Sequence, residues 1–224
     1  SYKVNYLEKD TNKEVATQKV VDNQTFETEI NAIHEIIAID GYNYDSISTE
    51  KLIIGTGENV INIYYTKRNN LTYKVNYLEK DTNTVLHEQK IGRNVVFDST
   101  IRTEDEIIEI DGYDYDSVDK EVLKITTGEN VINIYYTKRS DLNYKVNYLE
   151  KNTDKVLSKQ KIVNNVTFGM VVNSSDEIIN INGYNYDSAD KEELVIETGE
   201  NVINIYYTKR SDLSYTVNYL EKGT

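Results

Sequence analysis

The stretch Gly57-Glu58-Asn59-Val60-Ile61-Asn62-Ile63-Tyr64-Tyr65-Thr66-Lys67-Arg68 recurs unaltered from Gly128 and again from Gly199. Within it, β-branched and aromatic side chains alternate with period two, which is typical of a half-buried β-strand. Glycine and asparagine at its start indicate a turn that leads into this strand. One strand of fixed sequence, found three times, therefore makes this a repeat protein with β structure in each copy.

The start of the chain repeats with the same spacing. Residues 2–9 return at 73–80, at 144–151 and, with Thr216 in place of Lys, at 215–222, so every landmark moves by 71 residues. Solenoid repeats usually run about 20–45 residues, whereas a unit of this size can hold a small core of its own. The sequence therefore favours a string of domains over a stack of interdependent repeats. The predicted units are 2–72, 73–143 and 144–214, followed by the first strand of a truncated fourth repeat at 215–224.

Further elements follow from the pattern of the first copy. Alternation predicts an opening strand, Asp10-Thr11-Asn12 predicts a turn, and a second strand at about 14–21 should pair back as a hairpin. Residues 41–46 and 51–54 are also strand-like. Phe26 opens a segment whose isoleucines, Ile30, Ile33 and Ile37, have helical spacing. We expect one short helix or an irregular crossover there, packed by the phenylalanine.

The predicted fold class is therefore α+β and β-rich, with a mixed sheet and one short helix in each of three tandem domains. The segment between the first two copies, residues 67–71, contains no flexible Gly-Ser run. Short connections of fixed length predict an elongated rod.

Composition narrows the classes of partner. The net charge of −13 disfavours nucleic acid and anionic membranes as partners. The chain has no cysteine, which excludes disulfides, and no apolar run approaches the roughly 20 residues of a membrane helix. No charged-then-apolar leader is visible, so an export signal is expected outside this sequence. We expect no membrane insertion and a monomeric rod.

No reactive group recurs in a way that indicates an enzyme. His34 is replaced by Asp105 and Asp176 in the other copies, and the position of His87 is not histidine elsewhere. Recurrent carboxylates such as Glu35 are expected to be solvated in so acidic a chain. The sequence therefore predicts no catalytic site and no required cofactor.

Two other chemistries remain open. Asp111, Asp114 and Asp116 supply hard oxygen ligands that could bind Ca²⁺, and the alternative is a solvated hairpin loop. Lys3 and Asn62 lie on strands that could be neighbours and could form an isopeptide bond, whereas the alternative is an ordinary exposed pair.

Tyrosine offers the best candidates for recognition. The 20 tyrosines all fall at six repeat positions, so most should be structural. Neighbours on a strand face opposite sides, and one tyrosine of the closing pair must therefore point away from the core. Tyr64, Tyr135 and Tyr206 are the candidate ligand-binding residues, since an exposed tyrosine suits sugar stacking or a protein interface. The alternative is that they pack under the linker or against the next domain.

The chain resembles a known repeat family. The opening Tyr-x-Val-x-Tyr, the polar Asp-Thr-Asn turn, the central Gly-Tyr and the closing Asn-x-Ile-x-Tyr-Tyr-Thr-Lys are similar to the MucBP (mucin-binding protein) repeat. The resemblance covers each copy. The sequence differs from the family pattern in two places. Its first turn has no glycine, and Asp40, Asp111 or Asn182 stands where a proline often precedes the Gly-Tyr. The resemblance implies a ubiquitin-like β-grasp unit on wall-anchored surface proteins of Gram-positive bacteria, associated with mucus adhesion.

Two functions fit these observations. The first is a non-enzymatic stalk or adhesin segment, extracellular and anchored to the cell wall, that projects a terminal domain. The second is a binding module in which each repeat engages mucin glycans or a host glycoprotein, with avidity from repetition. A binding face should keep identical exposed residues in every copy, whereas a spacer lets them vary.

Overall fold

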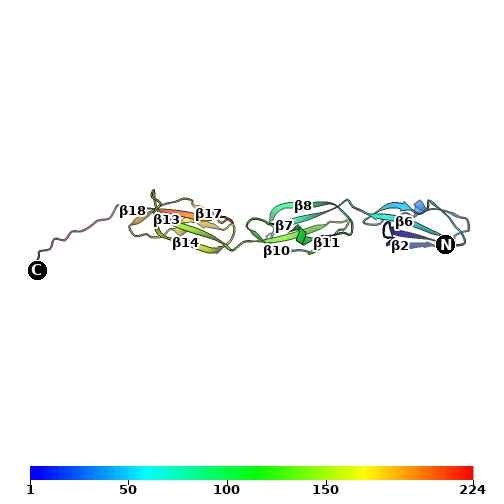
Figure 1. Cartoon of the computed structure of the whole chain (residues 1–224), viewed down its shortest axis with the longest axis horizontal. Coiled ribbons are helices and arrows are strands. Elements are labelled where there is room, and N and C mark those ends of the chain that lie inside the picture. The colour runs from blue at the N-terminus through cyan, green and yellow to red at the C-terminus, as the bar shows by residue number, and fades with distance from the viewer. Residues whose placement is uncertain (224) are drawn as a thin grey trace. The chain divides into compact units, whose positions relative to one another are not determined.

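The computed structural model describes residues 1–223, in which strands predominate and recur with the sequence period (Figure 1). Close contacts divide the chain into two compact units. One unit holds residues 1–108 and 116–135, and the other holds residues 109–115 and those from 136 onward.

Each copy contributes six strands and one 3-10 turn. The first copy contains β1 (Tyr2–Glu8), β2 (Glu14–Val21), β3 (Glu29–Asn31), η1 (Ala32–Glu35), β4 (Tyr42–Ile47), β5 (Lys51–Ile53) and β6 (Val60–Lys67). The second contains β7 (Leu71–Glu79), β8 (Val85–Val95), β9 (Thr100–Arg102), η2 (Thr103–Glu106), β10 (Tyr113–Val118), β11 (Val122–Lys124) and β12 (Val131–Lys138). The third contains β13 (Leu142–Glu150), β14 (Val156–Val166), β15 (Val171–Asn173), η3 (Ser174–Glu177), β16 (Tyr184–Ala189), β17 (Glu193–Val195) and β18 (Val202–Lys209).

The four long strands of a copy form one mixed sheet. In the first copy the order is β2-β1-β6-β4, and the other copies repeat it. The central strands β1 and β6 are parallel, while β2 and β4 pair antiparallel to them at the edges. The predicted mixed sheet and opening hairpin are confirmed. The predicted turn is also confirmed, with Asn12 in the left-handed conformation at φ 55°.

The core lies between this sheet and a second, smaller layer formed by β3, β5 and η1. Alternate residues of β1 and β6 face it, as the period-two pattern predicts. The buried apolar residues of the first copy are Tyr2, Val4, Tyr6, Ala32, Ile54, Ile61, Ile63 and Tyr65. The third copy buries the corresponding residues, except that Ser174 takes the place of Ala32, and it also buries Leu142, Val166, Val172 and Leu194.

The predicted short helix is present only as a 3-10 helix, η1, and the helical spacing of the isoleucines does not produce a longer one. The segment forms a short strand, β3, and a four-residue 3-10 turn. Ile30 packs against the core from β3, but the side chains of Phe26 and Ile33 are both 59% exposed. Pairing of β3 with β5 brings Ile30 beside Leu52, so the sheet pairing overrides the helical spacing. The expectation that the phenylalanine packs its own copy therefore fails for Phe26, whereas Phe168 does pack against the core of the third copy.

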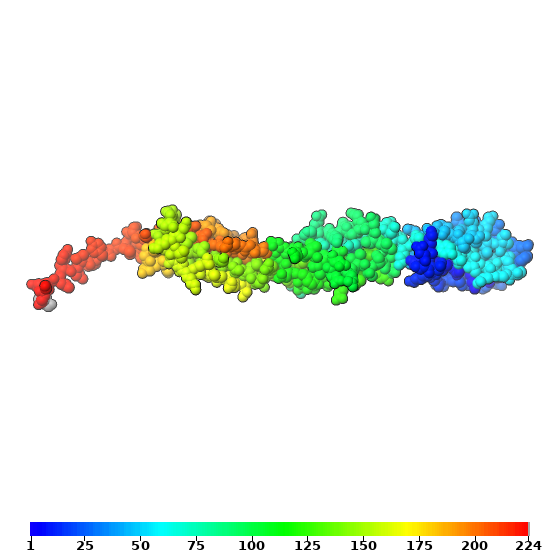
Figure 2. All heavy atoms as spheres, viewed as in Figure 1, coloured from blue at the N-terminus to red at the C-terminus, as the bar shows by residue number. Residues whose placement is uncertain are grey.

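The strand that opens each later copy begins within the segment between copies, of which residues 68–70 and 139–141 stay outside any strand. β7 begins at Leu71, which pairs with Val95 and is only 7% exposed. Leu142 likewise pairs with Val166 and is 6% exposed. Leu213, the next member of this series, is 65% exposed. It lies in a segment, residues 211–223, in which every residue is exposed (Figure 2).

Candidate interaction surfaces

The closing tyrosine pair faces opposite sides of the sheet. Tyr65 is 1% exposed in the core, whereas Tyr64 is half-buried on the outer face between its register partners Leu7 and Ser46. This orientation is as expected, and Tyr135 and Tyr206 occupy the same position in the other copies. The role of these three residues in binding stays a prediction.

An amide ladder crosses the same outer face. The Gln18 Nε2 donates to the Asn5 Oδ1 at 2.5 Å, and the Asn5 Nδ2 donates to the Asn62 Oδ1 at 2.7 Å. The second and third copies repeat both bonds and extend the ladder through Asp119 and Asp190, which accept from Asn133 and Asn204. This ladder was not predicted from the sequence.

The signal that could have found the ladder is the constancy of Gln18 and its neighbour Lys19. Both recur in every copy, while the two positions before them change each time. Amides beside a tyrosine ring offer donors, acceptors and an apolar face together, which is the chemistry that recognises sugar hydroxyls. The outer face of the sheet is therefore the recurrent candidate for a glycan ligand.

A buried carboxylate is held by a tyrosine and a lysine in every copy. The Tyr2 hydroxyl donates to the Glu35 Oε1 at 2.8 Å, and the Lys19 Nζ lies 2.5 Å from the Glu35 Oε2. Glu35 is 7% exposed, so the expectation that it is solvated is wrong. The same triad recurs as Tyr73–Glu106–Lys90 and Tyr144–Glu177–Lys161.

The triad shifts the pKa of its tyrosine. Burial, together with the hydrogen bond to Glu177 and the charge of that carboxylate, raises the pKa of Tyr144 to about 12. The hydrogen bond to Glu35 raises the pKa of Lys19. These two shifts favour the neutral tyrosine and the charged lysine, which favours a fixed structural contact.

The candidate cation ligands do not converge. The Asp111 Oδ1 accepts from Thr198, and the Asp116 carboxylate pairs with Lys80 at 2.7 Å. Within residues 1–223, no group of three or more His, Cys, Asp or Glu side chains is arranged to hold a metal ion.

The candidate crosslink residues also have other neighbours. The Asn62 Oδ1 accepts from Asn5, and the Lys3 Nζ lies 3.5 Å from the Glu58 Oε1. The register places Lys3 opposite Val60 rather than Asn62. The two groups of the proposed isopeptide bond are therefore not brought together.

The phenylalanine of one copy packs on the Gly-Tyr of the copy before it. The Phe97 and Tyr42 ring centroids are 5.6 Å apart in an edge-to-face arrangement. A Cβ on Gly41 would lie 2.4 Å from the Phe97 ring, so only glycine leaves room for it. The Phe97 N–H also donates to the Arg68 carbonyl at 2.7 Å. We call this contact the first joint, and both its sides lie in one compact unit.

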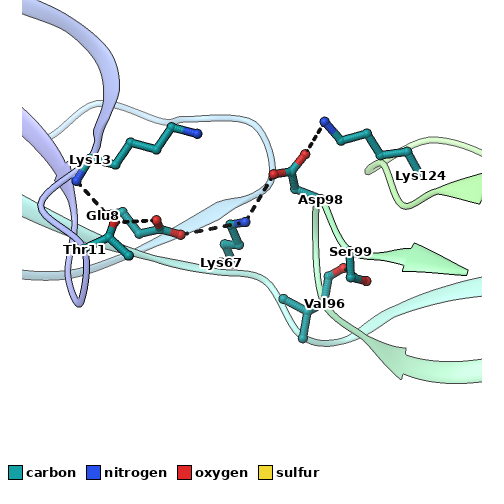
Figure 3. A network of polar contacts seen from close by, with 8 residues as sticks. All are labelled: Glu8, Thr11, Lys13, Lys67, Val96, Asp98, Ser99 and Lys124. Atoms are coloured by element: carbon teal, nitrogen blue, oxygen red, sulfur yellow. Dashed lines mark hydrogen bonds and ion pairs between the residues drawn. The ribbon is translucent and has the colours of Figure 1, made fainter.

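Polar contacts flank the first joint. The Thr127 hydroxyl donates to the Asp40 Oδ1 at 2.7 Å. Asp98 lies between Lys67, at 3.2 Å, and Lys124, at 2.5 Å, and thereby connects the end of β6 to β11 (Figure 3). These lysines lower the pKa of Asp98, Lys124 having the larger effect.

The second joint repeats the first. Phe168 and Tyr113 are 5.6 Å apart, a Cβ on Gly112 would lie 2.5 Å from the Phe168 ring, and the Phe168 N–H donates to the Arg139 carbonyl at 2.8 Å. Thr198 donates to Asp111 at 2.8 Å, as Thr127 does to Asp40. Both sides lie in the other compact unit. Position 98 becomes Gly169 here, so the carboxylate between two lysines belongs to the first joint alone.

Comparison with known proteins gives similarities at the level of solved structures. No protein-family model and no curated protein matches the chain. A structure named Mub-RV shares 15% identity and covers 62% of this chain and 98% of its own, with a TM-score of 0.25. Streptococcal SHIRT domains 3–4 from a cell surface protein share 10% identity, with 62% and 98% coverage and a TM-score of 0.25. The type 2 repeat of the mucus binding protein MUB from Lactobacillus reuteri shares 13%, with 62% and 99% coverage and a TM-score of 0.24.

None of the helices among residues 1–223 has the length and apolar character needed to cross a membrane.

Proposed function

We propose that this chain is a non-enzymatic stalk segment of an extracellular, wall-anchored bacterial surface protein, and that it projects a terminal domain. In this proposal the domains are 2–72, 73–143 and 144–214, each of the β-grasp kind, arranged as an elongated rod. The observation that carries it is the pair of joints. A phenylalanine seated on a glycine, with a backbone hydrogen bond beside it, holds neighbouring copies in contact rather than on a loose linker.

A stalk needs resistance to bending between its domains. Strand β7 starts only three residues after Arg68, whose N–H donates to Gly41 and whose carbonyl accepts from Phe97. The connection is thus hydrogen-bonded to both copies. Relative motion of the copies would have to break these bonds and expose the Phe97 ring, which opposes bending.

Small-angle X-ray scattering of the full chain tests the stalk. We expect a single extended conformation for the natural chain and a broader range of dimensions for the double variant Phe97→Ala, Phe168→Ala. Phe26→Ala is the matched control, because the Phe26 ring makes no joint within the chain. A natural chain as variable in dimensions as the double variant would refute the stalk.

A second candidate function is direct binding of mucin glycans or a host glycoprotein by each repeat. It is favoured by the outer face, where the amide ladder and Tyr64, Tyr135 and Tyr206 recur in every copy. The test measures binding of the natural chain and of the triple variant Tyr64→Ala, Tyr135→Ala, Tyr206→Ala to surface-bound mucin. Native mucin is compared with mucin stripped of its glycans. Binding that needs both glycans and tyrosines supports this candidate. Binding that survives the triple variant, or its complete absence, excludes this face.

A further inference from the structure

A groove of the first copy lies beside the first joint. It has a volume of about 500 Å³ and lies between the last residues of the crossover, the start of β4 and the chain that leaves β6. This volume is within the range of about 300–1,000 Å³ that is usual for small-molecule sites. We call it the arginine groove, and the lining residues that matter here are Ile39, Asp40, Asn43, Arg68 and Asn70.

The side chain of Arg68 is not used by the fold. Its backbone N–H and carbonyl bond to Gly41 and Phe97, but within residues 1–223 its guanidinium makes no hydrogen bond and no ion pair. The residue is half-buried, so the guanidinium is held at the groove. A guanidinium presents five N–H donors in a planar fork that matches the two oxygens of a carboxylate. Arg68 is therefore free to bind one.

The other two copies occupy the same arginine from within the chain. The Arg139 Nε and Nη2 donate to the Asp141 carboxylate at 3.0 and 2.9 Å. Arg210 donates in the same way to Asp212, with both distances 2.9 Å. Asn70 stands at the place of these two aspartates in the first copy. A carboxylate two residues further along thus fills the guanidinium fork in the later copies, and asparagine leaves it open in the first.

The surroundings of the arginine are also less acidic in the first copy. In the second copy the pKa of Arg139 is raised by a hydrogen bond and charge from Asp141 and by the charges of Asp114 and Asp111. Asn43 replaces Asp114 in the first copy. The carboxylate that remains there, Asp40, accepts from the Thr127 hydroxyl at 2.7 and 2.9 Å. An anion would therefore meet less repulsion beside Arg68 than beside Arg139.

Two amides complete the polar lining of the arginine groove. Asn43 and Asn70 are exposed, and within the described part of the chain neither side-chain amide has a hydrogen-bond partner. Each amide offers two donors and one acceptor, which suits hydroxyl groups. Ile39 is half-buried and adds an apolar wall.

We infer that the arginine groove binds a small carboxylic acid that also carries hydroxyl groups, as sugar acids do. The carboxylate lies on the Arg68 guanidinium, and the hydroxyls contact Asn43 and Asn70. The inference rests on neither proposed function, because neither the stalk nor the outer face of the sheet uses this groove. The site is open and the chain has a net charge of −13, so we expect a Kd on the order of 1 mM.

NMR titration of the isotopically labelled full chain tests the site with three probes. Glucuronate carries both the carboxylate and the hydroxyls, glucose replaces that carboxylate by a CH₂OH group, and acetate has the carboxylate alone. With each probe added to about 20 mM, glucuronate should give saturable amide shifts at Arg68 and Asn70. Glucose and acetate should bind at least about tenfold more weakly, a difference of about 1.4 kcal/mol.

Single substitutions in the first copy test the role of the free guanidinium. Asn70→Asp reproduces the residue of the later copies and should occupy Arg68, and Arg68→Gln removes the charge. Each should weaken glucuronate binding about tenfold or more. Position 70 is exposed and aspartate is natural at its equivalents, so the fold should be kept. Asn69→Ser is the matched control, since it also reproduces the later copies and should bind like the natural chain.

A gain of binding in the second copy gives the decisive result. The double variant Asp114→Asn, Asp141→Asn gives that copy the residues of the arginine groove, so new saturable shifts should arise at Arg139 while those at Arg68 stay unchanged. The triple variant of Tyr64, Tyr135 and Tyr206 should bind glucuronate normally, which separates this site from the outer face.

Four results would overturn the inference. One is the absence of saturable shifts at Arg68 in the natural chain, and another is binding that survives Asn70→Asp. The third is a double variant that gains no site at Arg139. The fourth is equal affinity for glucuronate and either of the other probes, because the groove would then not recognise a carboxylate and hydroxyls together.

Discussion

Three glycines with the same backbone conformation have different surroundings. Gly41, Gly112 and Gly183 have φ values of 80°, 78° and 80°. A Cβ would lie against a phenylalanine ring at the first two and in open space at the third. Substitutions at these equivalent positions can therefore distinguish two destabilising effects. One is the strain of a left-handed side chain, and the other is the loss of the contact with the phenylalanine ring.

Gly41→Ala should therefore be more harmful than Gly183→Ala. Both changes carry the strain of a left-handed alanine, about 1 kcal/mol, but only the first pushes the Phe97 ring from its seat. Calorimetric unfolding of the two variants measures the difference. Equal losses of stability would show that the Phe97 contact contributes nothing.

The tyrosine of the buried triad should lose its proton at a higher pH than an ordinary tyrosine. Tyr144 has a pKa of about 12 in the fold against 10.0 ordinarily, so the folded chain keeps its proton over a range in which the unfolded chain loses it. This contribution to stability is complete below pH 10 and declines as the pH rises toward 12. NMR titration of a chain labelled at the tyrosine ring measures the pKa, which should fall in Glu177→Gln. Glu200→Gln is the control, and no change in Glu177→Gln would contradict the triad's role.

The strand that opens each later copy begins inside the segment expected to be a linker. Leu71 and Leu142 are buried, whereas Leu213 is 65% exposed. Leu71→Ala should cost about 3 kcal/mol through the cavity it leaves, and Leu213→Ala should cost almost nothing. Amide hydrogen exchange should quicken in β7 and β8 for the first variant only. Unchanged exchange in Leu71→Ala would mean that this leucine does not stabilise the second copy's sheet.

The sequence predicted the strands well because their alternation is strict and repeated. The opening and closing strands, the hairpin at 14–21 and its turn all follow from period two and turn residues. The helical spacing within residues 26–37 did not predict strand β3. This strand forms because it pairs with β5, and local spacing does not reveal a contact between residues that are distant in the sequence.

The candidate sites were predictable to different degrees. The outward orientation of Tyr64 follows from alternation, but the amide ladder needs the register of three strands. The joints were not predicted, because the phenylalanine was expected to pack the segment that it opens. The sequence shows one phenylalanine and one Gly-Tyr in each copy. Only the tertiary structure shows that the phenylalanine of one copy contacts the Gly-Tyr of the copy before it.

Across the whole chain, the two joints share their aromatic contact and differ in their charges. Asp98 lies between two lysines at the first joint, and Gly169 replaces it at the second. Asp98→Asn should therefore loosen the first joint and leave the second unchanged. Amide exchange at Phe97 and Phe168, whose N–H groups bond across the joints, reads the two separately. Equal acceleration at both would contradict this difference.

The central claim is that neighbouring copies are held together by a phenylalanine seated on a Gly-Tyr, and pulsed electron paramagnetic resonance tests it most directly. The chain has no cysteine, so spin labels at Thr17→Cys and Glu88→Cys would mark equivalent exposed positions in the first two copies. We predict a narrow distribution of label distances that broadens in Phe97→Ala and is unchanged in Phe26→Ala. A distribution in the natural chain as broad as in Phe97→Ala would contradict the account.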